Sequence, residues 1–494
     1  MSRNNLVFYR NGERVELSNV EPNETLLDYL RLKEKKTGTK EGCNEGDCGA
    51  CTIALGRMQN GVLKYEPVNA CIQLLGQVDG CDIVSVDDLA VNGKLHPVQE
   101  AMVEAHGSQC GFCTPGFVMS LFALYHSNIS ADREAINEYI AGNLCRCTGY
   151  RPIAKAAQKA LNKKPKDFLV SRLKETEKQL SKLQADADLM LGDEDSFFAA
   201  PCSVRSLAKL VAKHPDATIL AGATDVGLWI TKQLKTLPKI IYIGRVKGLD
   251  SVKVSSKKID IGASATYAKA YDALANLHPD MHEVLSRLGS RHVRASGTIG
   301  GNIANGSPIG DMPPMLIALD AKLELMREGK KREIALEDFF IEYGKQDLKP
   351  SEFVSKVSIP TLQKNEQFKA WKISKRFDQD ISALLFAAKF KLKGRVIESA
   401  RIACGGMAGT PKRATHMEAA LMGVNLDMLD DVENSFSVFE KDFVPMSDMR
   451  ASADYRMQTV KNLLLKALHE MSMDSTDSTR VIGAKKSPKM EAAE

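Results

Sequence analysis

Eight of the eleven cysteines in this 494-residue chain lie within its first 150 residues. They form two sets of four, Cys43, Cys48, Cys51 and Cys71, and Cys110, Cys113, Cys145 and Cys147. The first set is spaced C-x₄-C-x₂-C with a distant fourth thiol, which is typical of a plant-type [2Fe–2S] cluster. The second set joins a C-x₂-C pair to a later C-x-C pair. Two clusters in one chain would carry single electrons, so the spacing makes electron transfer the leading hypothesis.

Two other uses of clustered cysteines compete with iron–sulfur ligation. Disulfides need an oxidising compartment, but the chain opens without an apolar leader and has no apolar run of membrane-spanning length. We therefore expect reduced thiols, a cytoplasmic location and no membrane contact. Structural zinc is the stronger rival, yet zinc shells rarely use C-x₄-C-x₂-C. The glycine-rich loop 40–51 favours iron–sulfur, because its backbone can turn tightly around negatively charged sulfides.

The composition fits a soluble protein of several domains. At ~150 residues per domain, the length predicts three or four domains. A hydrophobic content of 44% provides for several cores, and the small net charge of +5 gives nucleic-acid binding little support. Three cysteines lack cluster-like neighbours and are expected to be ordinary buried thiols: Cys81, Cys202 and Cys404. We expect an α+β multidomain fold.

The first 88 residues predict a small sheet with one helix. Asn11-Gly12 lies between two alternating apolar runs, which indicates a type I′ hairpin. A capped short helix at 25–30 and a strand at 52–55 flank the cysteine loop. This order suggests a ferredoxin-like β-grasp domain at 1–88.

The second cysteine set lies among helices. Residues 98–105 carry an amphipathic stripe, and Thr114-Pro115 is a plausible helix start. Further helices are expected around 136–140 and from Pro152. Four short helices with thiols on two connecting turns could enclose one cluster in a domain at 89–162, where helix N-termini would offset its negative charge.

Three runs resemble the two [2Fe–2S] domains of the xanthine dehydrogenase family of molybdenum hydroxylases. They are GCNEGDCGAC at 42–51, QCGFCTPG at 109–116 and NLCRCTGYRP at 143–152. All eight ligand positions of that family are present. The resemblance covers only the first third of the chain, so the remainder is argued separately.

A charged segment at 163–196 reads as a linker, and two small-residue turns follow it. Residues 219–226 (ILAGATDV) and 295–311 (ASGTIGGNIANGSPIGD) lack the G-x-G-x-x-G fingerprint, so a Rossmann domain is not indicated. Each turn could present backbone N–H groups to a pyrophosphate, although alone each is more often a plain tight turn.

Together, in this order, the two turns resemble the FAD-binding domain of the same family, a two-part, non-Rossmann (PCMH-like) domain expected here at 197–375. The resemblance implies cofactor contacts at Ile219, Leu220, Ala221, Gly222, Ala223, Thr224, Asp225, Val226, Thr298, Gly300, Gly301, Asn302, Asp311, Val354 and Lys372. Leu288 departs from the family, some members of which have an aromatic residue against the flavin there. We expect His292 to be solvated and assign it no role as a base.

Residues 376–472 resemble the family's small α/β C-terminal domain, and 473–494 are expected to form a disordered tail. The sequence ends where long-chain members continue into molybdopterin-binding domains, so we expect a partner large subunit in a heterotetramer or higher αβ assembly. The resemblance implies a xanthine dehydrogenase subunit that carries electrons to FAD and then NAD⁺, with no catalytic residue in this chain.

Three alternatives remain open from sequence. They are the equivalent subunit of an aldehyde, nicotinate or carbon monoxide hydroxylase, a stand-alone NADH-dependent flavin and iron–sulfur reductase, and a non-catalytic zinc scaffold.

Overall fold

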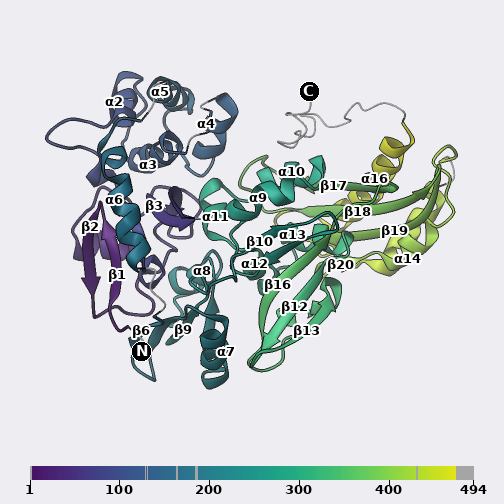
Figure 1. Cartoon of the computed structure of the whole chain (residues 1–494). Coiled ribbons are helices and arrows are strands. Elements are labelled where there is room, and N and C mark those ends of the chain that lie inside the picture. The colour runs from purple at the N-terminus through teal and green to yellow at the C-terminus, as the bar shows by residue number, and fades with distance from the viewer. Residues whose placement is uncertain are drawn as a thin grey trace. The chain divides into compact units, whose positions relative to one another are not determined.

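The computed structural model describes residues 3–59, 61–127, 129–130, 132–162, 165–183, 187–429 and 432–473 (Figure 1). The chain divides into two compact units. Unit 1 comprises residues 1–247 and 289–297, and unit 2 comprises residues 248–288 and 298–494. The tail expected from 473 onward lies outside the described residues, apart from Met473. No helix in the described part of the chain is both long and apolar enough to cross a bilayer.

Unit 1 begins with a five-stranded sheet in the order β2-β1-β5-β3-β4. Its strands are β1 Leu6–Arg10, β2 Glu13–Leu17, β3 Thr52–Gln59, β4 Val62–Asn69 and β5 Asp82–Val84. Asn11 and Gly12 have φ of 52° and 83°, as the type I′ hairpin requires, so this prediction is confirmed. The hydroxyl of Thr25 accepts the Asp28 N–H and starts the expected short helix, which comprises α1 Leu26–Asp28 and a π-helical turn, η1 Tyr29–Lys33.

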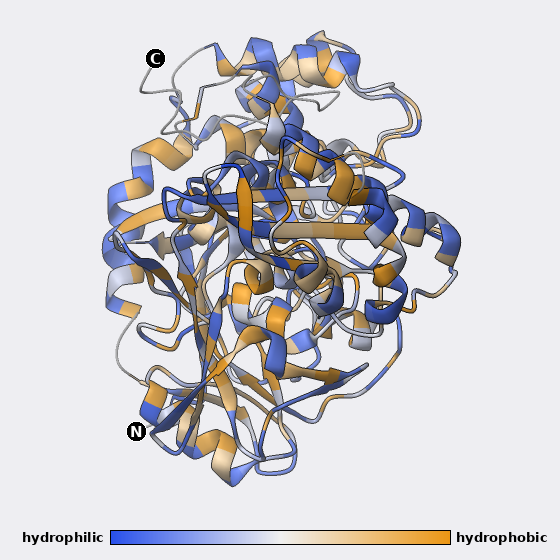
Figure 2. Cartoon of the chain, turned by 90° about the vertical axis from the view of Figure 1, so that its right-hand side faces the viewer, coloured by the Kyte–Doolittle hydropathy of each residue, from blue (hydrophilic) through white to orange (hydrophobic). Residues whose placement is uncertain are grey.

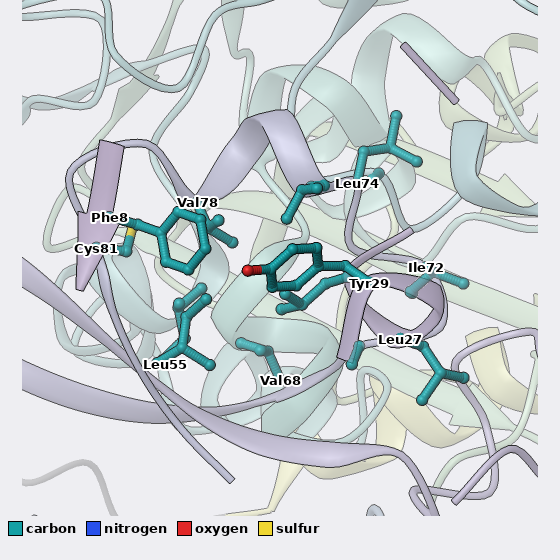
Figure 3. Close-up of a cluster of buried hydrophobic side chains, with 14 of the residues drawn as sticks. Phe8, Leu27, Tyr29, Leu55, Val68, Ile72, Leu74, Val78 and Cys81 are labelled. Carbon is teal, nitrogen blue, oxygen red and sulfur yellow. The ribbon is translucent and has the colours of Figure 1, made fainter. Parts of the chain in front are cut away.

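The sheet and its helix enclose a buried apolar cluster (Figure 3). The rings of Phe8 and Tyr29 meet edge to face with their centroids 5.8 Å apart. Cys81 lies in the same cluster, and Cys202 and Cys404 are also buried, as expected for cysteines without partners. Two short 3₁₀ turns complete this part, η2 Leu75–Val78 and η3 Val86–Asp88.

Four helices follow, close to the predicted positions: α2 Pro97–Glu104, α3 Thr114–Tyr125, α4 Arg133–Ile140 and α5 Arg151–Leu161. Proline in the first turn starts three of them, α2, α3 and α5, as its fixed φ and missing N–H allow. α3 is buried along nearly its whole length and packs on β3.

The segment expected as a linker at 163–196 is not an unpacked spacer. It contains α6 Phe168–Leu183, whose Leu169 and Leu180 are buried in the core of the helical domain. The Arg172 guanidinium lies 3.1 Å from the buried Asp82 carboxylate. The buried residues Leu169, Thr176 and Leu180 are spaced i, i+7 and i+11 and therefore share one helix face, which is why the run packs.

A second, four-stranded sheet in unit 1 has the order β6-β7-β9-β8. Its strands are β6 Leu189–Gly192, β7 Phe197–Ala200, β8 Thr218–Leu220 and β9 Lys239–Tyr242. The remaining helices of unit 1 are α7 Val204–Lys213, α8 Val226–Thr231 and α11 Arg291–Ser296, of which α11 packs on β4 of the first sheet. The second sheet packs into the same apolar cluster as the N-terminal sheet. Its strands contribute Phe198, Ile240 and Tyr242 to that cluster.

Unit 2 contains a five-stranded antiparallel sheet in the order β10-β11-β16-β12-β13. Its strands are β10 Val252–Val254, β11 Lys258–Gly262, β12 Lys322–Arg327, β13 Lys330–Ala335 and β16 Phe353–Pro360. Its other elements are α9 Tyr267–Ala275, α10 Pro279–Ser286, α12 Ile299–Asn305, α13 Met312–Ala318, the 3₁₀ turn η4 Leu336–Phe339, and the two-stranded β14 Phe340–Glu342 and β15 Lys345–Gln346. α12 packs on β16.

The second sheet of unit 2 is antiparallel, in the order β17-β18-β19-β20. Its strands are β17 Glu366–Ile373, β18 Leu384–Lys393, β19 Val396–Gly405 and β20 Lys412–Arg413. The helices expected after Thr415 are α14 Thr415–Ala420, the 3₁₀ turn η5 Val432–Val438, α15 Phe439–Asp442 and α16 Ala453–Ser472. In the view of the chain coloured by hydropathy, hydrophobic and hydrophilic residues alternate along the helices that face the viewer, as one-sided packing requires (Figure 2).

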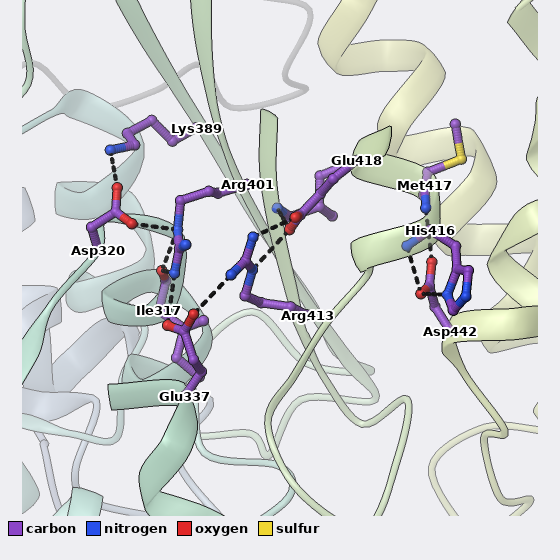
Figure 4. A network of polar contacts seen from close by, with 11 residues as sticks. Ile317, Asp320, Glu337, Lys389, Arg401, Arg413, His416, Met417, Glu418 and Asp442 are labelled. Carbon is purple, nitrogen blue, oxygen red and sulfur yellow. Dashed lines mark hydrogen bonds and ion pairs between the residues drawn. The ribbon is translucent and has the colours of Figure 1, made fainter. Parts of the chain in front are cut away.

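Charged side chains tie this second sheet to α13 and η4 (Figure 4). Arg401 and Arg413 share the Glu337 carboxylate, at 2.7 and 2.8 Å. The guanidinium of Arg401 also pairs with Asp320 at 2.7 Å.

Candidate cofactor sites

The first cysteine set converges at one end of the N-terminal sheet. The Cys43 N–H donates to Sγ of Cys48 at 3.2 Å, and the Cys48 N–H donates to Sγ of Cys43 at 3.3 Å. Cys71 enters from the loop after β4 and lies among the other thiols, with Cys51 beside it; both are buried. The four side chains predicted from spacing are thus brought together.

The thiols of this set fit a cationic cluster core. Hydrogen bonds from the Cys48 and Cys71 thiols lower the pKa of Cys43 below its ordinary range. The same contacts raise the pKa of Cys48 and of Cys71. The Cys43 thiolate is therefore stabilised at the expense of Cys48 and Cys71, and a positive centre such as an iron–sulfur core would favour the thiolate form of these three side chains together.

The second set is gathered by the turns before α3 and α5. Burial and the neighbouring Cys145 raise the pKa of the Cys113 thiol to about 12. A hydrogen bond to Cys110 raises the pKa of the exposed Cys147 thiol. Cys113 therefore lies in contact with Cys145, and Cys147 with Cys110. The Tyr150 hydroxyl accepts the Cys145 N–H at 3.0 Å, which anchors the C-x-C turn.

The two cysteine loops are hydrogen-bonded to each other. The backbone carbonyl of Cys48 accepts the Leu144 N–H at 2.9 Å, and Leu144 precedes the predicted ligand Cys145. Gly49 has a φ of +67°, and a Cβ there would lie 2.1 Å from the Gly142 carbonyl oxygen. Glycine is therefore required both for the backbone conformation and for this close approach.

The first predicted flavin turn, 219–226, lies in unit 1 between β8 and α8. The Ala221 carbonyl accepts the Gln77 side-chain amide at 3.0 Å. A Cβ at Gly222 would lie 2.0 Å from the carbonyl oxygen of Ser296, the last residue of α11. Close packing against α11 therefore accounts for the glycine at position 222. From the sequence, we expected this turn to approach a phosphate.

The second predicted turn lies in unit 2, and Gly297 joins it to α11 along the chain. The Thr298 hydroxyl accepts the Gly301 N–H at 3.0 Å and caps α12. The Gly300 N–H donates to the Ala263 carbonyl. Oδ1 of Asn302 is buried without a hydrogen-bond partner among the described residues. This free acceptor fits a ligand that brings hydroxyl or N–H groups, as FAD does.

Asp311 and Lys372 form a buried ion pair in unit 2. Nζ of Lys372 lies 2.6 Å from Oδ2 of Asp311, and it also donates to the Arg287 carbonyl at 3.3 Å. The Ser382 hydroxyl donates to Oδ1 of Asp311 at 2.5 Å. Both carboxylate oxygens thus have protein partners. The remaining predicted contact, Val354, lies buried on β16 opposite Leu325 of β12.

Sequence reasoning missed two polar residues beside these sites and misjudged a third. Ser382 and Arg287 hold Asp311 and Lys372 in place, and the Arg287 guanidinium donates to the Lys372 carbonyl at 3.1 Å. The expectation of a solvated His292 is wrong: it is 1% exposed, because α11 packs into unit 1. Only long-range packing distinguishes these positions, so no local pattern could have revealed them.

Four family models match successive parts of the chain. They are a 2Fe-2S iron-sulfur cluster binding domain over residues 8–72, a [2Fe-2S] binding domain over 85–158, an FAD binding domain in molybdopterin dehydrogenase over 194–362, and a CO dehydrogenase flavoprotein C-terminal domain over 369–471.

The chain is also similar in sequence to curated xanthine dehydrogenases. The chain is 31% identical to the xanthine dehydrogenase of Drosophila subobscura, over 98% of this chain and 40% of that protein. It is 32% identical to the xanthine dehydrogenase/oxidase of Mus musculus, over 82% of this chain and 34% of that protein. The chain therefore spans two-fifths or less of the length of these relatives.

Solved structures match a shorter part. A Cu,Mo-CO dehydrogenase chain matches with a TM-score of 0.52 and 25% identity, covering 56% of this chain and 96% of that chain. A reconstituted CO dehydrogenase from Oligotropha carboxidovorans matches with a TM-score of 0.52 and 26% identity, covering 57% of this chain and 98% of that chain. Family models and relatives agree on two 2Fe-2S domains and an FAD-binding domain.

Proposed function

The chain carries the iron–sulfur and FAD-binding region of the xanthine dehydrogenase family, and from that premise we propose that it transfers electrons for a molybdenum hydroxylase. Electrons from hydroxylation of xanthine or hypoxanthine would enter from a molybdopterin-binding partner. They would cross the two [2Fe–2S] sites to FAD and leave to NAD⁺.

The hydrogen bond between the cysteine loops carries this proposal. The Cys48 carbonyl and the Leu144 N–H are 2.9 Å apart, so a ligand residue of one site touches the residue before a ligand of the other. A zinc scaffold has no need for such proximity, whereas single-electron transfer depends on it. The exposed Cys110 and Cys147 make the helical domain the natural entry side.

The proposed flavin contacts are those implied by the resemblance, residues 219–226, Thr298, Gly300, Gly301, Asn302, Asp311, Val354 and Lys372. When bound, FAD accepts electrons singly and delivers a hydride to NAD⁺. Within unit 2, the Asn302 amide would bind a cofactor hydroxyl or N–H group, and the Lys372 ammonium would provide a fixed positive charge oriented by Asp311.

The assembly is also part of the proposal. A molybdopterin-binding large subunit would pair with this chain in a heterotetramer or higher αβ complex. The complex would work in the cytoplasm, where the cysteine ligands stay reduced.

Reconstitution tests the proposal. The chain alone should oxidise NADH with an artificial acceptor but show no xanthine-dependent reduction of its clusters. Adding the molybdenum partner should give turnover from xanthine to NAD⁺. Cys147→Ser should abolish that turnover and spare NADH oxidation. Molybdenum-free xanthine oxidation by this chain would contradict the proposal.

A different hydroxylase substrate is the second candidate, favoured by the likeness to chains of CO dehydrogenase. The same partner complex, assayed with purines, aldehydes, nicotinate and carbon monoxide, separates the two. Cluster reduction by one of the other substrates and not by xanthine would select this candidate.

A further inference from the structure

A chain of buried polar side chains runs from α11 to the first cysteine loop. Nε2 of His292 lies 2.9 Å from the Ser120 hydroxyl, which lies 2.6 Å from Oδ1 of Asn143. The Asn143 amide donates to the Gly49 carbonyl at 3.0 Å and to the Thr52 hydroxyl at 3.2 Å. All four side chains are at most 1% exposed. Gly49 lies between the ligands Cys48 and Cys51, and Asn143 lies two residues before Cys145.

The hydrogen bonds along this row of side chains have one consistent set of directions. The Asn143 amide nitrogen donates to Gly49 and Thr52, so its oxygen must accept the Ser120 hydroxyl proton. The Ser120 oxygen is then free to accept from Nε2–H of the neutral His292. Burial and the nearby Arg294 and Arg291 lower the pKa of His292 to about 3, so the imidazole stays neutral at physiological pH.

At the His292 end of this row of polar side chains, two arginines of α11 hold the helix in place. The Arg291 guanidinium makes two hydrogen bonds to the Glu66 carboxylate on β4, at 3.0 and 2.9 Å. Arg294 donates to Glu138 on α4 at 2.8 Å. α11 is therefore fixed to the sheet and to the helical domain at once, and His292 has little freedom to follow a moving cysteine loop.

We propose that His292, Ser120 and Asn143 are positioning residues that fix the separation of the two iron–sulfur clusters. The inference rests on the proposed function, in which these clusters exchange electrons. Asn143 joins the loops directly, Ser120 orients the Asn143 amide, and His292 orients Ser120. Because electron transfer depends steeply on distance, a loosened loop would slow electron exchange between clusters that are each intact.

The test uses the full chain loaded with both clusters. Ser120→Ala removes the central hydroxyl, and Ser120→Thr retains it. At the other end, His292→Leu removes the donor, and His292→Gln can restore an N–H. Tyr65→Phe is the matched control, because it removes a buried hydroxyl of the same unit that bonds Asp82 at 2.5 Å and takes no part in this chain of polar side chains; Tyr65 lies on β4 opposite Gly56.

Two measurements are made on each variant. The first is the spin–spin splitting between the two reduced clusters in low-temperature EPR spectra, with iron content as the check on loading. The second is amide hydrogen exchange of the peptides containing Gly49 and Leu144, which reports the loop contact without electron transfer.

We expect Ser120→Ala and His292→Leu to keep both clusters, to change or broaden the splitting, and to speed amide exchange at both peptides. Ser120→Thr, His292→Gln and Tyr65→Phe should resemble the wild type. Wild-type splitting and exchange in Ser120→Ala would overturn the inference and leave the proposed function intact. Should Ser120→Ala not fold, the His292→Leu and His292→Gln pair decides by the same criteria. A wild-type chain without iron would instead refute the proposed function.

Discussion

The ammonium of Lys372 and the carboxylate of Asp311 lie 2.6 Å apart, with their side chains only 2% and 8% exposed. The two residues are 61 positions apart in the sequence. β17 supplies the lysine, the turn before α13 supplies the aspartate, and Ser382 completes the carboxylate's hydrogen bonds. Such a pair is costly to break, because either partner alone is a buried, uncompensated charge.

Lys372→Met should therefore destabilise the protein by about 3–5 kcal/mol and lower its FAD content. Replacing Asp311 as well, as Lys372→Met with Asp311→Leu, should restore part of the stability but not the FAD content. Thermal unfolding and FAD released on denaturation measure the two effects. Lys322→Met is the control, because that exposed lysine pairs with Glu333 at the surface and should matter little. Full FAD content in the double variant would remove this pair from the flavin site.

The convergence of the two cysteine sets was predictable because its information is local. Cysteine spacing and Thr114-Pro115 at a helix start depend on neighbours in sequence, and the structure places them as expected. The burial of His292 depends instead on α11 packing into unit 1, across residues distant in sequence. Likewise, α6 has too few apolar residues to distinguish a packed helix from a solvated one until β3 and β4 are present beside it.

Cys48→Ser should remove the EPR signal of one cluster and retain the other, with iron content falling to about half. Cys202→Ser is the control, because that buried thiol has no cysteine partner and donates to the Ala187 carbonyl. Iron and sulfide analysis of protein purified without air exposure gives the readout. Zinc in place of iron would contradict the cluster assignment.

Gly301→Val should lower FAD occupancy while both cluster signals persist. Gly301 lies near the start of α12, where its N–H donates to the capping Thr298 hydroxyl, so a branched side chain would disturb the helix start that the resemblance assigns to the cofactor. Gly409→Val is a fair control, because a Cβ there meets only ordinary contact with Tyr343 at 3.7 Å. Equal FAD content in the two variants would mean that this turn does not bind the flavin.

The Glu337 carboxylate should stabilise the folded protein near neutral pH and lose this effect in acid. Burial alone would raise the pKa of Glu337, but the hydrogen bonds and charges of Arg401 and Arg413 outweigh it and lower the pKa. A lowered carboxyl pKa stabilises the folded state above the unfolded value of about 4.3, and this contribution is lost as the pH falls through the folded pKa. Glu337→Gln should therefore destabilise the protein by about 1–3 kcal/mol near pH 7, and its deficit in Tm should shrink below about pH 4.3. Scanning calorimetry of wild type and variant across this range measures the gap, with the surface variant Glu398→Gln as the control that should show almost none. A gap that widens in acid would mean that the two arginines do not hold this carboxylate ionised.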